Sequence, residues 1–136
     1  MGFIKSFYLF LVFPIFYPNT VASSELNPKE IYINYRCVKC HSMKVENIEP
    51  LEEEIIKGKK IVDHSGVGLK YSNEWIKRWL LKQEEKDGKK HKIKFKGTEE
   101  ELETLSKWLA EKKAEISEQE LKDWYSEIIN RIRNSK

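Results

Sequence analysis

The sequence predicts one all-α domain with an additional C-terminal helix. Apolar residues recur at three- and four-residue spacing in four segments, a residue that can cap a helix precedes each, and no pair of strand-like segments is visible. The 136 residues allow one domain of ordinary size. Apolar residues make up 40% and charged residues 35%, which is lean for so short a chain, so we expect the helices to fold around a metal or prosthetic group.

Charge and cysteine content exclude two classes of protein. The chain has 25 Lys and Arg against 22 Asp and Glu, and a net charge of +3 is too small to indicate a nucleic-acid-binding protein. Its two cysteines, Cys37 and Cys40, are too close in sequence to hold a fold together, which excludes a disulfide scaffold.

Residues 1–22 have the pattern of a secretory signal peptide. Lys5 precedes the apolar run 7–13, prolines follow, and small residues lead to a polar stretch after Ala22. We expect cleavage after Ala22 or Ser23 and export to a bacterial periplasm. The alternative is an uncleaved membrane anchor, but the apolar segment has about half of the ~20 residues that a membrane-spanning helix needs. After cleavage we expect no stable membrane span.

The mature chain is predicted to consist of a domain over residues 23–115 and an amphipathic helix over residues 116–136. The domain begins with a short helix, because Asn27 can cap it and Pro28 suits its first position. Ile31 and Tyr35 share one face of this helix. The following residues up to Gly68 are mostly irregular, with a turn or two of helix over residues 51–57.

Two further helices belong to the predicted domain. Ser72 and Asn73 cap the first, which we expect to run from Glu74 to about Lys86 with Trp75, Trp79 and Leu80 on its apolar face. A lysine-rich loop follows, with Ile93 and Phe95 expected to turn inward. Thr98 caps the second helix, and its acidic first turn suits the positive end of the helix dipole. The buried face of this second helix carries Leu102, Leu105, Trp108 and Leu109.

The last helix begins at Ser117, whose sequence Ser-Glu-Gln-Glu is a capping box. We expect it to pack back on the domain; binding a partner or a membrane surface is the alternative. Its apolar stripe consists of Leu121, Trp124, Tyr125, Ile128, Ile129 and Ile132.

The segment Cys37-Val38-Lys39-Cys40-His41 is a C-x-x-C-H motif, which attaches c-type haem. Two cysteines three apart can each add to one vinyl group of a porphyrin, and the next residue can direct a neutral imidazole at the iron. The motif follows an export signal and uses every cysteine of the chain. A thioredoxin-like dithiol would need a βαβ context, and a zinc site would need ligand spacings that the sequence lacks. We therefore expect one covalent haem c, with His41 as the proximal iron ligand.

From about Asn27 to Lys113 the chain resembles the class I cytochrome c family. In that family an N-terminal helix leads into C-x-x-C-H, and a G-P-x-L segment follows; Gly66-Val67-Gly68-Leu69 is similar to it. The resemblance implies that the backbone carbonyl of Val67 accepts a hydrogen bond from the His41 ring. It also implies that Trp108 lies on a helix that crosses the first one, and that an indole N–H of Trp75 or Trp79 can reach a haem propionate.

The sequence departs from the family at the sixth ligand of the iron. The only methionine of the mature chain, Met43, lies two residues after His41 and cannot reach the opposite side of the ring, so we expect it to pack or lie in a loop. By register with the family, Lys92 takes the place of the usual methionine. Baring a lysine nitrogen at pH 7 costs roughly 4–5 kcal/mol, whereas histidine has no comparable cost. We favour His91 as distal ligand, with Lys92 or an open iron as the alternatives.

His64 is the remaining histidine, and we expect it to be a surface or loop residue. The lysines of the loop are expected either to form a solvated face or to line the haem edge, where a basic rim steers acidic redox partners in the family. They are Lys86, Lys89, Lys90, Lys92, Lys94 and Lys96.

The first functional hypothesis is an exported monohaem cytochrome c that is an electron carrier rather than an enzyme. It would shuttle single electrons between a protein donor and a protein acceptor in the periplasm. The second is a haem-based sensor that binds gas or another small ligand at an open distal site. The third is the haem subunit of a larger periplasmic oxidoreductase complex, for which the extra C-terminal helix is the support.

Overall fold

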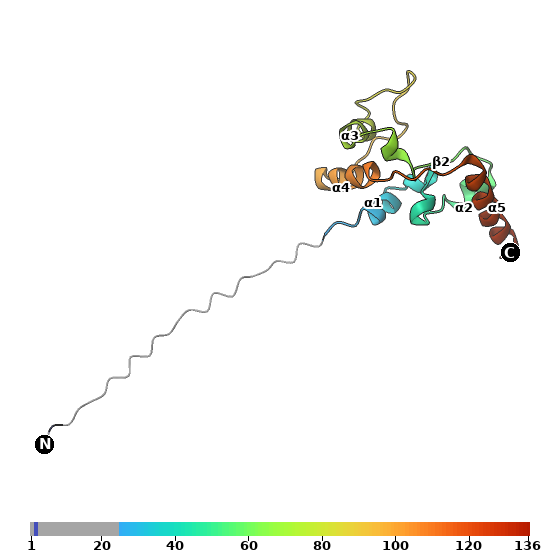
Figure 1. Cartoon of the computed structure of the whole chain (residues 1–136), viewed down its shortest axis with the longest axis horizontal. Helices are drawn as coiled ribbons and strands as arrows, with labels where there is room; N and C mark the ends of the chain where they lie inside the picture. Colours follow the sequence, from blue (N-terminus) through green and yellow to red (C-terminus); the bar gives the residue numbers. More distant parts are fainter. Residues whose placement is uncertain (1, 3–24) are drawn as a thin grey trace.

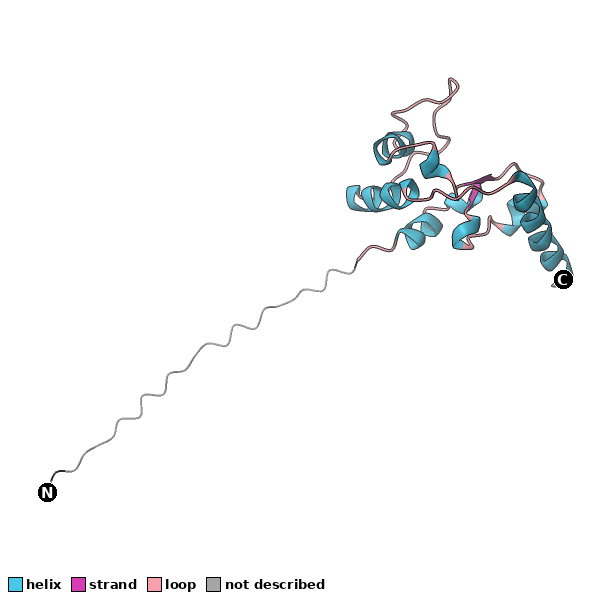
Figure 2. Cartoon of the chain, in the orientation of Figure 1, coloured by secondary structure: helices cyan, strands magenta, loops and turns pink. Residues whose placement is uncertain are grey.

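A computed structural model describes Gly2 and residues 25–136 of the chain. Apart from Gly2, the predicted signal peptide and its cleavage position lie outside the described residues. The described residues are rich in helix, which confirms the all-α prediction at the level of fold class (Figure 2). The α-helices are α1 (Pro28–Asn34), α2 (Glu52–Ile56), α3 (Asn73–Leu80), α4 (Glu99–Ala110) and α5 (Glu118–Asn134), with 3₁₀ helices η1 (Cys37–Lys39), η2 (Lys44–Glu46) and η3 (Val67–Leu69) between them.

Helix α4 is the centre of the packing, with α1 and α3 against it (Figure 1). The rings of Tyr32 on α1 and Trp108 on α4 meet edge to face, 5.8 Å apart between their centres. Leu105 on α4 and Tyr32 are fully buried. The core that these helices enclose consists of Ile31, Tyr32, Val38, Met43, Ile48, Ile76, Leu80, Leu102, Leu105 and Leu109.

The predicted caps are confirmed. The side chains of Asn27, Ser72, Thr98 and Ser117 each accept a hydrogen bond from a backbone N–H in the first turn of their helix. At α4 the bond is reciprocal, since the Glu101 carboxylate also accepts the backbone N–H of Thr98, which makes a complete capping box. The box predicted at Ser117 has only the bond from the Glu120 N–H to the Ser117 hydroxyl. These short polar side chains replace the helical partners that the first N–H groups lack.

Helix α3 is shorter than predicted, ending at Leu80 instead of about Lys86. The N–H of Gln83 bonds back to the carbonyl of Arg78 at 2.8 Å, and Lys82 adopts a left-handed conformation with a φ of 61°. This pattern closes a helix C-terminus, and it normally uses glycine at the left-handed position. Because a lysine occupies that position here, the sequence carried no stop signal.

The inward orientation predicted for Ile93 is wrong, because 53% of this residue is exposed. Phe95 does turn inward: it is half-buried, its ring centre lies 4.5 Å from that of Tyr35, and its N–H bonds to the Leu80 carbonyl. One of the two alternating apolar residues of the loop therefore reaches the domain, and the other faces solvent.

Two very short strands were not predicted. Strand β1 (His41–Ser42) pairs in parallel with β2 (Val62–Asp63), so that His41 lies opposite Val62 and Ser42 opposite Asp63. Two residues per strand are too few to give a periodic pattern in the sequence. The pairing joins the C-x-x-C-H motif to a segment some twenty residues later.

Helix α5 packs on α2, at the end of the molecule away from the α3–α4 loop (Figure 1). Ile128 is its buried residue, with 2% exposed, and Arg131 makes two hydrogen bonds of 2.6 Å to the carboxylate of Glu49. The expectation that the last helix packs back on the domain is thereby confirmed.

Candidate functional site

The C-x-x-C-H motif occupies the turn that follows α1. Arg36 adopts a left-handed conformation with a φ of 57°, which ends α1 and starts η1. One turn of 3₁₀ helix separates Cys37 from Cys40, and the N–H of Cys40 bonds to the carbonyl of Cys37 at 3.1 Å. Both cysteines are free and half-buried. Burial raises the pKa of the Cys37 thiol to about 11, the opposite of the shift that activates a redox dithiol.

His41 begins β1 and is held by the strand that it pairs with. Its Nδ1 lies 3.2 Å from the carbonyl oxygen of Val62, which can only accept, so Nδ1 carries the proton and donates. Burial lowers the pKa of His41 to about 4, although the Val62 carbonyl opposes this shift. The ring is therefore neutral at pH 7, and the lone pair of Nε2 is available to a metal ion.

The carbonyl partner of His41 differs from the one that the family resemblance implied. Gly66 to Leu69 forms η3, which packs on the C-terminal end of α4, and the Gly68 N–H bonds to the Lys112 carbonyl at 2.8 Å. A side chain at Gly68 would collide with the Ala110 carbonyl, so a glycine is required there. The segment is thus used for packing, and Val62 takes the role expected of Val67.

His91 is brought to the same site by a tight turn. Asp87 and Gly88 both have positive φ, and Lys86 and Lys89 exchange two backbone hydrogen bonds across them, which turns the chain back toward α3. The His91 ring packs on Trp79, with the two ring centres 5.7 Å apart. Its Nδ1 lies 2.5 Å from the carbonyl of Ile93, so it has the same tautomer as His41. Burial lowers the pKa of His91.

The rings of His41 and His91 face each other with their centres 6.3 Å apart and their planes at 14°. A metal–imidazole bond is about 2.0 Å long and the ring nitrogen lies about 1.2 Å from the ring centre, so two imidazoles on opposite sides of one metal ion have centres about 6.4 Å apart. The centre-to-centre distance between the two rings matches this separation, and hydrogen bonding at Nδ1 leaves the Nε2 lone pair of each ring free. The donor set of two thiols and two imidazoles is the one that a covalent haem would use, and joint ligation would require both Nε2 atoms to point toward the iron.

Lys92 and Met43, the other residues considered as iron ligands, do not lie beside the His41 ring as His91 does. Lys92 is exposed. Met43 is fully buried in the core, where its backbone exchanges hydrogen bonds with Ile48. The expectation that Met43 is a packing residue is confirmed.

His64 was expected at the surface or in a loop, and the loop alternative is confirmed, although the residue is not exposed. It follows β2 directly, is half-buried, and stacks on His41 with a centre-to-centre distance of 3.9 Å. Its Nδ1 lies 3.1 Å from the hydroxyl of Tyr32. Burial and the neighbouring His41 lower the pKa of His64 well below its ordinary value. All three histidines of the chain therefore gather at one place.

Aromatic residues continue outward from His91 along α3. The Trp79 and Trp75 rings stack with centres 5.2 Å apart, and Trp75 stacks on Tyr71 at 4.0 Å. The Lys86 ammonium lies over the Tyr71 ring, 5.3 Å from its centre. Both tryptophans are half-buried: Trp79 contacts His91, and Trp75 packs against the core.

The lysine-rich loop, residues 86–96, surrounds His91 with positive charge. Its six lysines stand against a single acidic residue, Asp87. All six side chains are exposed, namely Lys86, Lys89, Lys90, Lys92, Lys94 and Lys96.

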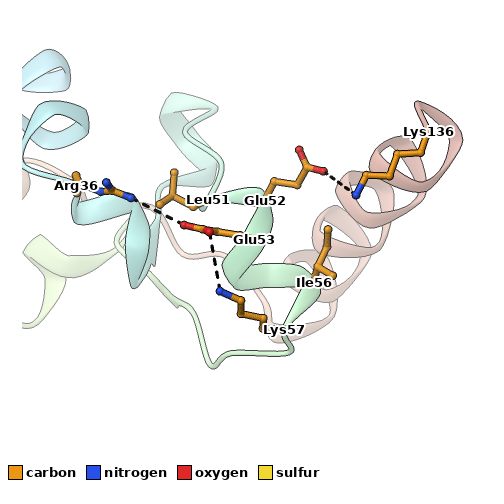
Figure 3. Close-up of a pocket in the computed structure, with 7 residues that line it drawn as sticks. All are labelled: Arg36, Leu51, Glu52, Glu53, Ile56, Lys57 and Lys136. Atoms are coloured by element: carbon orange, nitrogen blue, oxygen red, sulfur yellow. Dashed lines mark ion pairs between the residues drawn. The ribbon is translucent and has the colours of Figure 1, made fainter.

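A separate hollow of about 520 Å³ lies between α2 and the C-terminal end of the chain (Figure 3). Leu51 and Ile56 supply its apolar lining, and ion pairs cross it. The ion pairs are Arg36–Glu53 at 3.9 Å, Lys57–Glu53 at 3.9 Å and Lys136–Glu52 at 3.8 Å. Because these charges are engaged in ion pairs and the histidines lie elsewhere, the hollow is not part of the candidate site.

Several residues that build the site were not predicted. Tyr32 and Val62 act through a buried hydroxyl and a backbone carbonyl, and Ser42 with Asp63 supports them from β1 and β2. The spacing placed Tyr35 on the face of Ile31, but Tyr35 is exposed and Tyr32 is the second buried residue of α1. Val62, Ser42 and Asp63 come together through the pairing of β1 with β2, which no periodicity in the sequence predicts.

Comparisons of the chain with protein-family models, with curated proteins and with solved structures found no match. Among Gly2 and residues 25–136, no helix is long and apolar enough to cross a membrane.

Proposed function

We propose that this chain is an exported monohaem c-type cytochrome that carries single electrons between periplasmic redox partners. Cys37 and Cys40 hold the haem through two thioether bonds, His41 is the proximal iron ligand and His91 the distal one. The observation that carries the proposal is the C-x-x-C-H motif together with the position of His91, whose ring centre lies 6.3 Å from that of the motif's own histidine, His41.

The packing supports a resemblance to class I cytochromes c. The edge-to-face pair of Tyr32 and Trp108, between the first helix and a later one, is the contact that the resemblance implies. Helix α3, with its stacked tryptophans, lies on the side of His91.

Each residue of the site has a role in the proposed carrier. The haem iron supplies the chemistry by cycling between its ferric and ferrous states. The carbonyls of Val62 and Ile93 accept the Nδ1 protons and so orient the two imidazoles, while Trp79 keeps His91 in place. Two imidazole ligands are expected to give a lower reduction potential than a histidine and a methionine.

An electron carrier is favoured over a ligand sensor by the position of His91. A sensor would need a free distal position, and the turn at Asp87-Gly88 supports the carrier because it brings the His91 imidazole close to His41. The oxidoreductase-subunit hypothesis loses part of its support, because Tyr125 and Ile128 of α5 already pack on the chain's own domain.

Covalent attachment of haem is the first test. The full chain is expressed with a periplasmic c-type maturation system, and we expect a haem-stained band that survives denaturing electrophoresis. The double variant Cys37→Ala/Cys40→Ala should lose that band, while Lys39→Ala, an exposed change inside the motif, should keep it. Haem that extracts into acidified acetone, or a protein without Soret absorbance, contradicts the proposal.

Carbon monoxide distinguishes the carrier from the sensor. We expect no rapid binding of carbon monoxide to the ferrous wild-type protein, because His91 occupies the sixth position. Rapid binding by the wild type supports the sensor instead.

A further inference from the structure

Helix α5 touches the site through one hydroxyl group. The hydroxyl oxygen of Tyr125 lies 2.7 Å from that of Ser42, the fully buried residue that follows His41. Ser42 donates its only proton to the Asp63 carboxylate at 2.8 Å, so Tyr125 must be the donor to Ser42. A directed chain of hydrogen bonds therefore runs from Tyr125 through Ser42 to Asp63.

Asp63 is the point where this chain reaches both strands. The oxygen that accepts from Ser42 also accepts the backbone N–H of Lys44 at 2.9 Å, and its other oxygen accepts the N–H of Ser65 at 2.9 Å. Ser42 and Asp63 are strand partners. The side-chain network thus fixes β1 to β2, which backbone bonds alone hold over only two residues per strand.

The neighbouring strand pair is the one that orients the proximal ligand. His41 and Val62 are partners in the same register, and the Val62 carbonyl accepts the His41 Nδ1 proton at 3.2 Å. A shift of β2 relative to β1 therefore moves the acceptor on which the orientation of the imidazole depends. Such outer partners are known to tune metal ligands.

Other contacts keep α5 in place independently of Tyr125. Glu120 pairs with Lys44 at 2.5 Å, Arg131 holds Glu49 through two bonds, and Ile128 is buried. Loss of one hydroxyl should leave the helix docked, so the effect of Tyr125 on His41 can be separated from the effect of helix docking.

We propose that Tyr125 is a positioning residue for His41, acting through Ser42 and Asp63, so that the C-terminal helix adjusts the proximal ligand of the iron. The inference rests on the proposed function for its haem readouts. It gives α5, which lies beyond the part of the chain that resembles cytochrome c, a role in setting the reduction potential.

The test compares Tyr125→Phe with Glu120→Gln. The first removes the hydroxyl and keeps the ring, and the second removes the ion pair to Lys44 and leaves Ser42 untouched. Two amides report on the strands, since Val62 N–H bonds to the Cys40 carbonyl and His64 N–H to the Ser42 carbonyl. We expect hydrogen exchange at both to be roughly five- to tenfold faster in Tyr125→Phe, as loss of one hydrogen bond implies.

The effect on His41 as an iron ligand is measured on the haem-loaded protein. Tyr125→Phe should shift the reduction potential and the ferric EPR spectrum, and Glu120→Gln should leave both as in the wild type. Faster exchange with an unchanged potential and spectrum overturns the inference, as does an equal change in Glu120→Gln. If the protein is isolated without covalent haem, the proposed function fails, and the NMR signals of the His41 ring are measured in place of the reduction potential. A shift of these signals in Tyr125→Phe but not in Glu120→Gln supports the inference. No shift in Tyr125→Phe overturns it.

Discussion

Met43 follows His41 by two residues and is fully buried among the core residues of the domain. Its position predicts a structural role with no part in iron ligation. We expect Met43→Ala to cost about 2–5 kcal/mol of unfolding free energy and Met43→Leu less than about 1.5 kcal/mol, measured by urea denaturation. The ferric EPR spectrum of Met43→Leu should equal that of the wild type, and a change to it would show that Met43 binds the iron.

Much of the site could be predicted at the level of single residues, and the reasons for the rest are physical. Cys37, Cys40 and His41 form a motif with fixed spacing, and the cost of baring a lysine nitrogen favoured His91 over Lys92. The partners of these ligands could not be predicted in the same way. Val62 contributes a backbone carbonyl, which every residue has, so its side chain carries no signal.

His64 illustrates the same limit. Nothing next to it in the sequence indicates Tyr32, whose hydroxyl binds its ring, because the two residues meet only through the fold. A histidine within a polar, irregular segment is usually exposed, and this one is half-buried because β2 carries it to His41.

At the scale of elements, the start of α4 depends on Thr98. Its hydroxyl accepts the N–H of Glu101 at 3.1 Å, and α4 is the helix on which α1 and α3 pack. We expect Thr98→Ala to destabilise the protein by about 1 kcal/mol in a denaturant titration. Thr104→Ala makes the same chemical change inside the helix and is the control; equal losses from the two variants would show that the cap is not the cause.

The Glu101 carboxylate adds a pH-dependent part to this capping box. The hydroxyl of Tyr35, followed by the Thr98 backbone N–H, lowers the pKa of Glu101 below its usual 4.5. A carboxylate whose pKa is lower in the folded than in the unfolded protein stabilises the fold at pH values above its unfolded-state pKa. This stabilisation is lost as the pH falls through the folded-state pKa. Wild type should therefore be more stable than Glu101→Gln near neutral pH, and their urea midpoints should converge as the pH falls below 4.5. A difference between the midpoints that stays constant with pH contradicts this assignment.

Helix starts were predictable from the sequence and one helix end was not. Each N-cap residue acts through its own side chain, so its residue type predicts the start of the helix. These residues are Asn27, Ser72, Thr98 and Ser117. The end of α3 depends on the left-handed backbone of Lys82, a conformation that lysine rarely adopts and does not signal.

At the scale of the whole molecule, charge is distributed unevenly. The lysine-rich loop, residues 86–96, carries six exposed lysines beside His91, although the whole chain has a net charge of only +3. If acidic partners dock there, an anionic redox reagent should exchange electrons faster at low ionic strength than at high. Reversing two charges, Lys90→Glu/Lys94→Glu, should slow this reaction by roughly three- to tenfold at low salt.

The control for this prediction is Lys122→Glu/Arg133→Glu, which changes the net charge by the same amount on α5, at the opposite end of the molecule (Figure 1). A rate lowered equally by the loop variant and by this control would place the effect in the net charge and contradict docking at the loop. The measurement is stopped-flow spectroscopy of the haem band at several salt concentrations, because screening shortens the range of such attraction to about 10 Å at 0.1 M.

The ferric EPR spectrum at low temperature tests the central claim most directly, because it reports the two axial ligands of the iron. With an imidazole on each side, the wild-type protein should give a low-spin signal. We predict that His91→Ala loses this signal and that Lys92→Ala, one residue away and exposed, retains it. A spectrum that is unchanged in His91→Ala would contradict the account, and one changed only in Lys92→Ala would assign the sixth position to the lysine.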